Sequence, residues 1–151
     1  HRSLERPLFV EEFNAPGDWK GEVAGGVARA APSPGSPVDA LHLLSSKPIF
    51  SIPIRGRFEF VYRAPQGGEL LVQLHTTDPA QNFDHPLRLA PAADWKTAAI
   101  DFDAFVPADP NDRGRRLKPG RGIDHLQMLF TPGPKGGAFW VDAIRAVESR
   151  P

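Results

Sequence analysis

Cysteine is absent from this chain of 151 residues, so it has no disulfide framework, no thiolate metal site and no thiol nucleophile. A net charge of one sign is absent too, because 18 basic residues balance 18 acidic ones. The overall positive field expected of a nucleic-acid-binding domain is therefore missing. No apolar run reaches the roughly 18 residues that a membrane-spanning helix needs, so the sequence predicts no transmembrane segment.

Glycine and proline, in contrast, are plentiful, with 14 and 17 residues. They divide the chain into short segments whose apolar residues alternate along the chain, and no long segment has apolar residues at helical spacing. The pattern predicts an all-β fold: an antiparallel β-sandwich (jelly roll) of about nine strands in two sheets, forming one domain over residues 1–151. The expected strands are Leu8–Phe13, Val23–Ala31, Val38–Leu44, Arg57–Ala64, Glu69–Thr77, His85–Leu89, Trp95–Phe102, Ile123–Thr131 and Ala138–Val147.

The start of the chain suggests a segment of a longer protein. His1 stands where an initiator methionine would, and no signal sequence follows. We therefore expect other domains of a parent chain among its partners. The lack of cysteine fits either redox compartment, and an extracellular, periplasmic or cell-envelope location is the one we favour.

Alternation along a strand assigns each side chain to the core or to the outside. The inward set is apolar, and we expect it to lie between the two sheets: Phe58, Phe60, Val72, Leu74, Met128 and Phe130. In a jelly roll, the strands beginning at Val38, Ile123, Glu69 and His85 would be neighbours in one sheet. Their outward side chains would then form one polar patch, made of His42, Gln73, His75, Arg88, His125 and Gln127.

Short motifs spread over most of the chain carry a family resemblance: Val10-Glu11-Glu12-Phe13 with Trp19, Arg57-Phe58-Glu59-Phe60, Asp94-Trp95, Ile100-Asp101-Phe102 with Phe105, Ile123–Phe130, and Phe139–Ile144. Together they resemble the galactose-binding-like jelly roll of carbohydrate-binding modules. The resemblance is greatest to the β-glucan-binding family and to the complex I intermediate-associated protein family. Each motif is short and mainly reflects packing.

The resemblance implies a sugar site on the concave sheet and a structural calcium ion near the chain ends. Glu12 and Asp142 occupy the places of two calcium ligands, although Ala143 stands where the family commonly has a second acidic residue. Such modules stack sugar rings on exposed Tyr or Trp. Here the single tyrosine, Tyr62, has core parity, so we expect hydrogen bonding to dominate over ring stacking.

Three histidines on neighbouring strands, His42, His75 and His125, allow three interpretations. They could form hydrogen bonds to a ligand, bind a transition metal, or be solvated surface residues without a role. Nothing else in the sequence points to catalysis. The Gly-x-Ser-x-Gly elbow is missing, and no pair of carboxylates shares an evident buried setting.

The long loop Asp103–Gly122 contains a second candidate site. Five basic residues gather in it: Arg113, Arg115, Arg116, Lys118 and Arg121. The loop is either a solvated connection or a patch for an anionic ligand, and Arg115 and Arg116 would then bind carboxylate or sulfate.

These observations predict a non-catalytic carbohydrate-binding module that recognises a glycan on the concave sheet, with an acidic glycan favoured by the basic loop. Two alternatives remain open. One is a scaffold sandwich that binds another protein and no sugar. The other, more distant, is a metal-dependent enzyme that uses the surface histidines.

Overall fold

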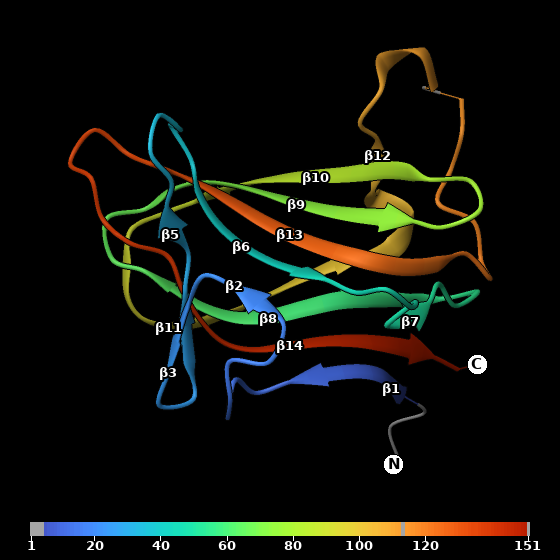
Figure 1. Ribbon diagram of the computed structural model, residues 1–151, viewed down its shortest axis with the longest axis horizontal. Helices are drawn as coiled ribbons and strands as arrows, with labels where there is room; N and C mark the ends of the chain where they lie inside the picture. The colour runs from blue at the N-terminus through green and yellow to red at the C-terminus, as the bar shows by residue number, and fades with distance from the viewer. Residues whose placement is uncertain (1–4, 113, 151) are drawn as a thin grey trace.

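Antiparallel strands make up most of the computed structural model, which describes residues 5–112 and 114–150 and is 60% strand and 4% helix. Two sheets face each other (Figure 1), which confirms the expected sandwich. The six-stranded sheet consists of β1 (Glu5–Glu11), β3 (Glu22–Ala24), β4 (Val27–Arg29), β8 (Gly56–Ala64), β11 (Ala92–Asp101) and β14 (Trp140–Ser149).

The eight-stranded sheet consists of β2 (Trp19–Lys20), β5 (Ala31–Pro32), β6 (Asp39–Leu44), β7 (Phe50–Ser51), β9 (Gly68–Thr76), β10 (Gln81–Leu89), β12 (Val106–Pro107) and β13 (Gly122–Pro132). Its main strands lie in the order β12-β10-β9-β13-β6-β2. The adjacency of β6, β13, β9 and β10 is the one that the jelly-roll interpretation predicts. Every pairing in both sheets is antiparallel.

The core lies between the sheets and consists of the inward side chains that alternation predicts. Phe58, Val72, Leu74, Met128 and Phe130 are fully buried, and Phe60 is 1% exposed. Aromatic rings link the sheets as well, since Phe139 of the six-stranded side stacks on Phe130 with ring centroids 5.4 Å apart. Burial of such side chains supplies most of the free energy that holds the strands in register.

The strand expected at Val23–Ala31 is wrong as a single element. The chain reverses at Gly25 and Gly26, whose φ angles of 62° and 81° suit the two central positions of a tight hairpin turn. The hairpin pairs β3 with β4, and β5 then joins the opposite sheet. Two glycines between short apolar runs are a hairpin signal, and the prediction of a single strand overlooked it.

The stretch from 103 to 122, expected as a plain loop, contains short elements. These are β12 and two 3-10 helices, η1 (Phe102–Ala104) and η2 (Pro110–Asp112). β12 pairs with the edge of β10, and Leu117 is buried against the core. The stretch is therefore anchored at two points. In the described part of the chain, no helix is long and apolar enough to cross a membrane.

Candidate functional site

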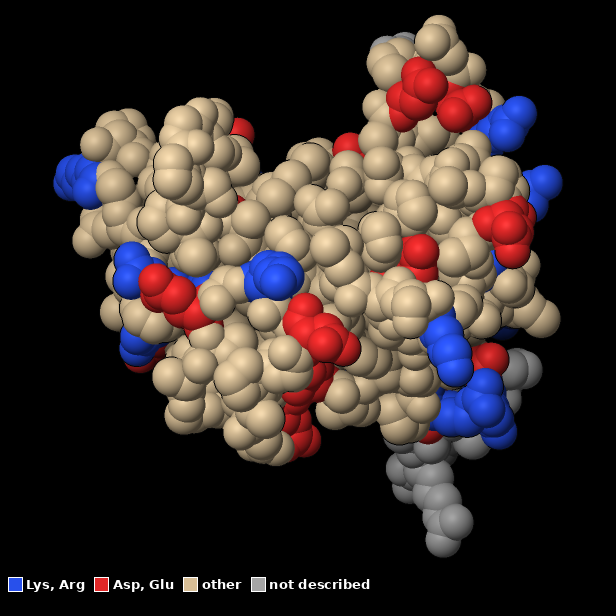
Figure 2. Space-filling view, viewed as in Figure 1, with Lys and Arg blue, Asp and Glu red and all other residues tan. Residues whose placement is uncertain are grey.

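The outward face of the eight-stranded sheet, called the open face below, lies between raised loops. In Figure 2 the upper surface is hollowed between two higher ends, which correspond in Figure 1 to the loops beside β5 and β12. The floor of this hollow comes from β6, β13, β9 and β10. Side chains of the same parity on these four strands therefore face a common solvent-filled space.

A row of hydrogen-bonding side chains crosses the open face. Gln127 on β13 lies opposite His42 on β6 and opposite Gln73 on β9, and Gln73 lies opposite Asp84 on β10. The Gln73 amide nitrogen donates to an Asp84 carboxylate oxygen at 2.8 Å. All four side chains are half-buried, so they are held in place but remain accessible. The row offers amide, carboxylate and imidazole groups in one line.

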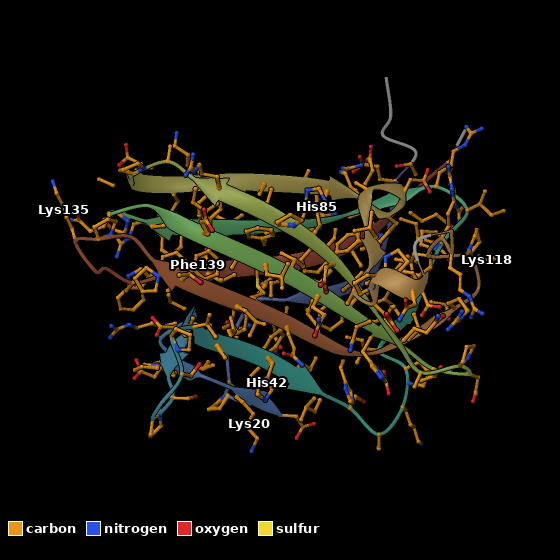
Figure 3. All side chains as sticks on the ribbon, turned by 90° about the horizontal axis from the view of Figure 1, so that it is seen from above. Lys20, His42, His85, Lys118, Lys135 and Phe139 are labelled. Carbon is orange, nitrogen blue, oxygen red and sulfur yellow. The ribbon has the colours of Figure 1, made fainter. Side chains whose placement is uncertain are left out.

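His42 has a pKa below its ordinary value of 6.5. Partial burial is the main cause, and the nearby charges of Lys20 and His125 lower it further. Lys20 and His42 lie together at one edge of the open face (Figure 3). The imidazole is therefore neutral at pH 7, with one ring nitrogen as donor and the other as acceptor.

A second group, called the histidine–aspartate cluster below, consists of His75, Asp124 and His125. The rings of His75 and His125 stack with centroids 4.6 Å apart and planes 20° apart. One Asp124 oxygen is 2.7 Å from His75 Nδ1, and the other is 3.6 Å from His125 Nε2. The carboxylate thus bridges the two imidazoles. His42, the third predicted histidine, is not part of this group.

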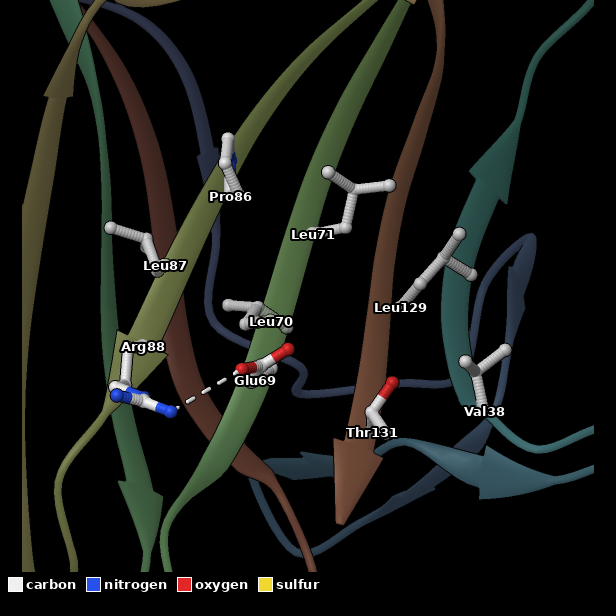
Figure 4. A pocket seen from close by; sticks show the side chains of 9 residues that line it. All are labelled: Val38, Glu69, Leu70, Leu71, Pro86, Leu87, Arg88, Leu129 and Thr131. Carbon is white, nitrogen blue, oxygen red and sulfur yellow. Dashed lines mark ion pairs between the residues drawn. The ribbon is translucent and has the colours of Figure 1, made fainter. Parts of the chain in front are cut away.

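An apolar groove occupies the other half of the open face (Figure 4). Leu71, Leu129 and Pro86 form its floor, and the space has a volume of about 540 Å³. At its end Arg88 faces Glu69, with N and O 3.9 Å apart. The expected single polar patch is therefore wrong in one respect: the apolar floor separates Arg88 from the histidines and glutamines.

The sequence contained a signal for most of the residues that were missed. Leu71 and Leu129 share parity with Gln73 and Gln127, so alternation places them on the open face as well. Asp84 shares parity with Arg88 in the same way. Asp124 had no such signal, because strict alternation would turn it away from its neighbour His125.

The basic loop lines a separate groove of about 580 Å³, to which Arg115, Arg116, Lys118 and Arg121 contribute. Its charges differ in how freely they face solvent. The Arg121 guanidinium donates to Thr76 Oγ1 at 2.6 Å and to the Pro79 carbonyl at 2.5 Å, so it holds the β9–β10 turn. Arg115 Nε lies 3.6 Å from an Asp112 carboxylate oxygen, and Arg116 is exposed to solvent. Arg113 lies outside the described residues.

The two expected calcium ligands, Glu12 and Asp142, are both exposed. Their neighbour Glu11 is already engaged, since its carboxylate accepts from the Phe13 backbone N–H at 2.9 Å and from Trp19 Nε1 at 2.8 Å. Among the described residues, the histidine–aspartate cluster is the group of three or more His, Asp and Glu side chains close enough to share a metal ion. The calcium site stays a prediction.

Trp95, which is exposed, and Trp140, which is half-buried, lie on the outside of the six-stranded sheet. The Arg63 guanidinium carbon is 5.2 Å from the Trp95 ring centroid and 5.8 Å from that of Trp140. Arg29 covers Trp140 from the neighbouring strand at 5.2 Å. Trp95 is 40% exposed, whereas Trp19 is buried in the core.

No protein-family model matches the chain, and no curated protein matches its sequence. Solved structures do match. A mutant of a carbohydrate binding module of family 29 superposes with a TM-score of 0.57 at 16% identity, over 96% of this chain and 92% of that one. The chain has the jelly-roll fold of a carbohydrate-binding module. Another mutant of that family, "complexed with cellulohexaose", matches with the same TM-score, identity and coverage.

Larger proteins contain this module fold as one part. The agarase AgWH50C matches with a TM-score of 0.63 at 9% identity, over 95% of this chain but 26% of that one. PfGH50B matches with a TM-score of 0.63 at 10% identity, over 99% and 23%. The chain thus spans about a quarter of each of these two proteins, and these identities show a shared fold alone.

Proposed function

We propose that this module binds a glycan along the open face and has no catalytic role of its own. The observation that carries the proposal is the pairing of the apolar groove with the row of Gln73, Asp84, Gln127 and His42 on one accessible surface. A sugar presents both C–H faces and hydroxyl groups. The apolar floor suits the former, and the amide, carboxylate and imidazole groups suit the latter.

The fold neighbours add support from a different direction. The family 29 module described as complexed with cellulohexaose shares this fold over nearly its whole length. In this chain, no tryptophan or tyrosine is among the residues that line the groove or form the polar row. Recognition here would therefore depend on hydrogen bonds and aliphatic contacts, and an affinity below that of an aromatic platform is expected.

In its more specific form, the proposal is that the glycan carries an acidic group. Arg115, Arg116 and Lys118 belong to the segment that leads into β13, at the end of the open face where the histidine–aspartate cluster lies. Lys118 lies at the opposite end of the molecule from Lys135 (Figure 3). Guanidinium groups in this position suit a carboxylate or sulfate on a sugar that extends beyond the polar row.

The test is a binding titration against neutral and acidic oligosaccharides. Replacing both Gln73 and Gln127 with alanine removes hydrogen bonds worth about 1 kcal/mol each, so affinity should fall roughly 30-fold. Asn14→Ala is the matched control, because this exposed amide follows β1, a strand of the other sheet. Absence of binding across both classes of sugar would refute the proposal. Capture of a protein partner in its place would favour the scaffold alternative.

A further inference from the structure

Two imidazoles and a carboxylate converge at the end of the open face that lies beyond the polar row. The ligand atoms of His75, Asp124 and His125 all lie within 4.8 Å of one another. Their side chains are 23%, 16% and 32% exposed, so the group is neither deeply buried nor freely solvated. The glycan proposal does not require these three residues, and the cluster needs its own explanation.

A β-bulge creates this arrangement. In the pairing of β13 with β9, Ile123 lies opposite Thr76 and His125 lies opposite His75, which leaves Asp124 as the extra residue. Such a residue breaks the alternation of the strand and redirects its side chain. Because of the bulge, the consecutive residues Asp124 and His125 both face His75, whereas regular alternation would place them on opposite sides of the sheet.

One of the two distances from the Asp124 carboxylate is close to the separation of two ligands in a coordination sphere. Ligands at about 2.0–2.1 Å from a tetrahedral zinc ion lie roughly 3.3–3.4 Å apart. The separation of 3.6 Å between Asp124 and His125 Nε2 is near that value. The Asp124 carboxylate oxygen and His75 Nδ1 are 2.7 Å apart and form a hydrogen bond. A bound ion would take the place of the proton that these two atoms share. The three ligand atoms already lie within 4.8 Å of one another, and changes in the side-chain torsions of His75, Asp124 and His125 are needed to bring them around one ion.

We infer that the histidine–aspartate cluster is a binding site for a divalent transition-metal ion, with zinc as the reference. Neutral imidazole and carboxylate are the ligands that zinc and its neighbours in the first transition row accept, whereas calcium takes oxygen ligands alone. Three protein ligands leave the fourth tetrahedral position to water or to another oxygen. This site is distinct from the calcium site expected at Glu12 and Asp142, and it does not depend on whether a glycan binds.

Titration of the metal-free protein with Zn²⁺ in a calorimeter tests the inference, and Co²⁺ gives a second readout through its visible absorption in tetrahedral coordination. Saturable binding of a single ion is expected. His75→Gln and Asp124→Asn should each weaken it by more than tenfold, because loss of even an outer-shell partner lowers metal affinity by roughly 10–100-fold. Bound Zn²⁺ should also raise the melting temperature of the wild type, and should raise that of the His75→Gln and Asp124→Asn variants much less.

His85→Gln is the matched control. This histidine is on the same sheet, but its Nδ1 lies 3.2 Å from the Ala104 carbonyl oxygen and its ring lies beside Phe105. Its removal should leave zinc affinity unchanged. Circular dichroism establishes that each variant is folded, and Asp124→Asn preserves the shape of the side chain. Absence of saturable Zn²⁺ binding, or equal affinity in wild type and all variants, would overturn the inference.

Discussion

The titration of His42 affects the stability of the folded protein at mildly acidic pH. Its pKa is lower in the folded protein than the ordinary 6.5, so the unfolded chain takes up the proton first. The free energy of unfolding is therefore unaffected by His42 well above pH 6.5. It declines as the pH falls from 6.5 through the lower, folded-state pKa, because the unfolded chain then binds more protons. His42→Gln should lose less stability than wild type between pH 7 and pH 5. Urea denaturation of the metal-free proteins at both pH values measures this, and equal losses would contradict it.

Arg121 and Arg116 belong to the same basic loop but differ in what their side chains contact. The Arg121 guanidinium satisfies the buried Thr76 hydroxyl and the Pro79 carbonyl, whereas Arg116 is exposed. Arg121→Met should lower the free energy of unfolding by about 1.5–3 kcal/mol, the range for hydrogen bonds to charged groups. Arg116→Met should change it by less than about 0.5 kcal/mol. Chemical denaturation compares them, and equal effects would show that Arg121 is as dispensable as its neighbour.

Among the elements, the basic loop carries the charge hypothesis. If Arg115 and Arg116 bind an acidic group, affinity for an acidic oligosaccharide should weaken markedly between low and physiological salt, because exposed charges are screened beyond roughly 8–10 Å. Replacing both arginines with glutamine should reproduce that loss at low salt. The melting temperature should stay unchanged, since exposed ion pairs contribute little to folding.

A neutral oligosaccharide is the control for this experiment, and its affinity should be insensitive to salt and to the double substitution. If the acidic oligosaccharide behaves in the same way as the neutral one, the loop is a solvated connection. The proposed sugar site on the open face would be unaffected by that result, because its test depends on Gln73 and Gln127 alone.

For the whole molecule, the question is what joins the ends of the chain. β1 pairs with β14 along most of its length, and Arg57 of β8 forms ion pairs with Glu5 and Glu59. A calcium ion held by Glu12 and Asp142 would add a further link between the first and last strands. Calcium added to metal-free protein should then raise the melting temperature, since an ion bound only to the folded state stabilises it.

Asp142→Asn should abolish the response to calcium and leave the response to zinc unchanged. An identical melting curve of the wild type with and without calcium would show that these two carboxylates hold no ion. The two metal predictions are therefore separable by ion and by variant.

The sequence by itself determined the fold class, the residues of the core and which side chains point to the open face. These features are local: alternation decides on which side of a strand Phe60 or Gln127 lies, and apolar residues on one side require a second layer to cover them. The jelly-roll order followed once the number and spacing of the strands were known.

Only the tertiary structure decided which outward residues meet. Arg88 faces the same side of the sheet as the two glutamines but lies beyond the apolar floor. Alternation gives the side of the sheet on which a residue lies, and it does not give the distance along the strand that separates these residues. Arg121 turns to the β9–β10 turn, a contact between residues more than 40 positions apart in sequence. Asp124 joins two histidines because a bulge adds one residue to β13 relative to β9. A bulge is a property of the pairing between two strands, so neither strand's own sequence reveals it.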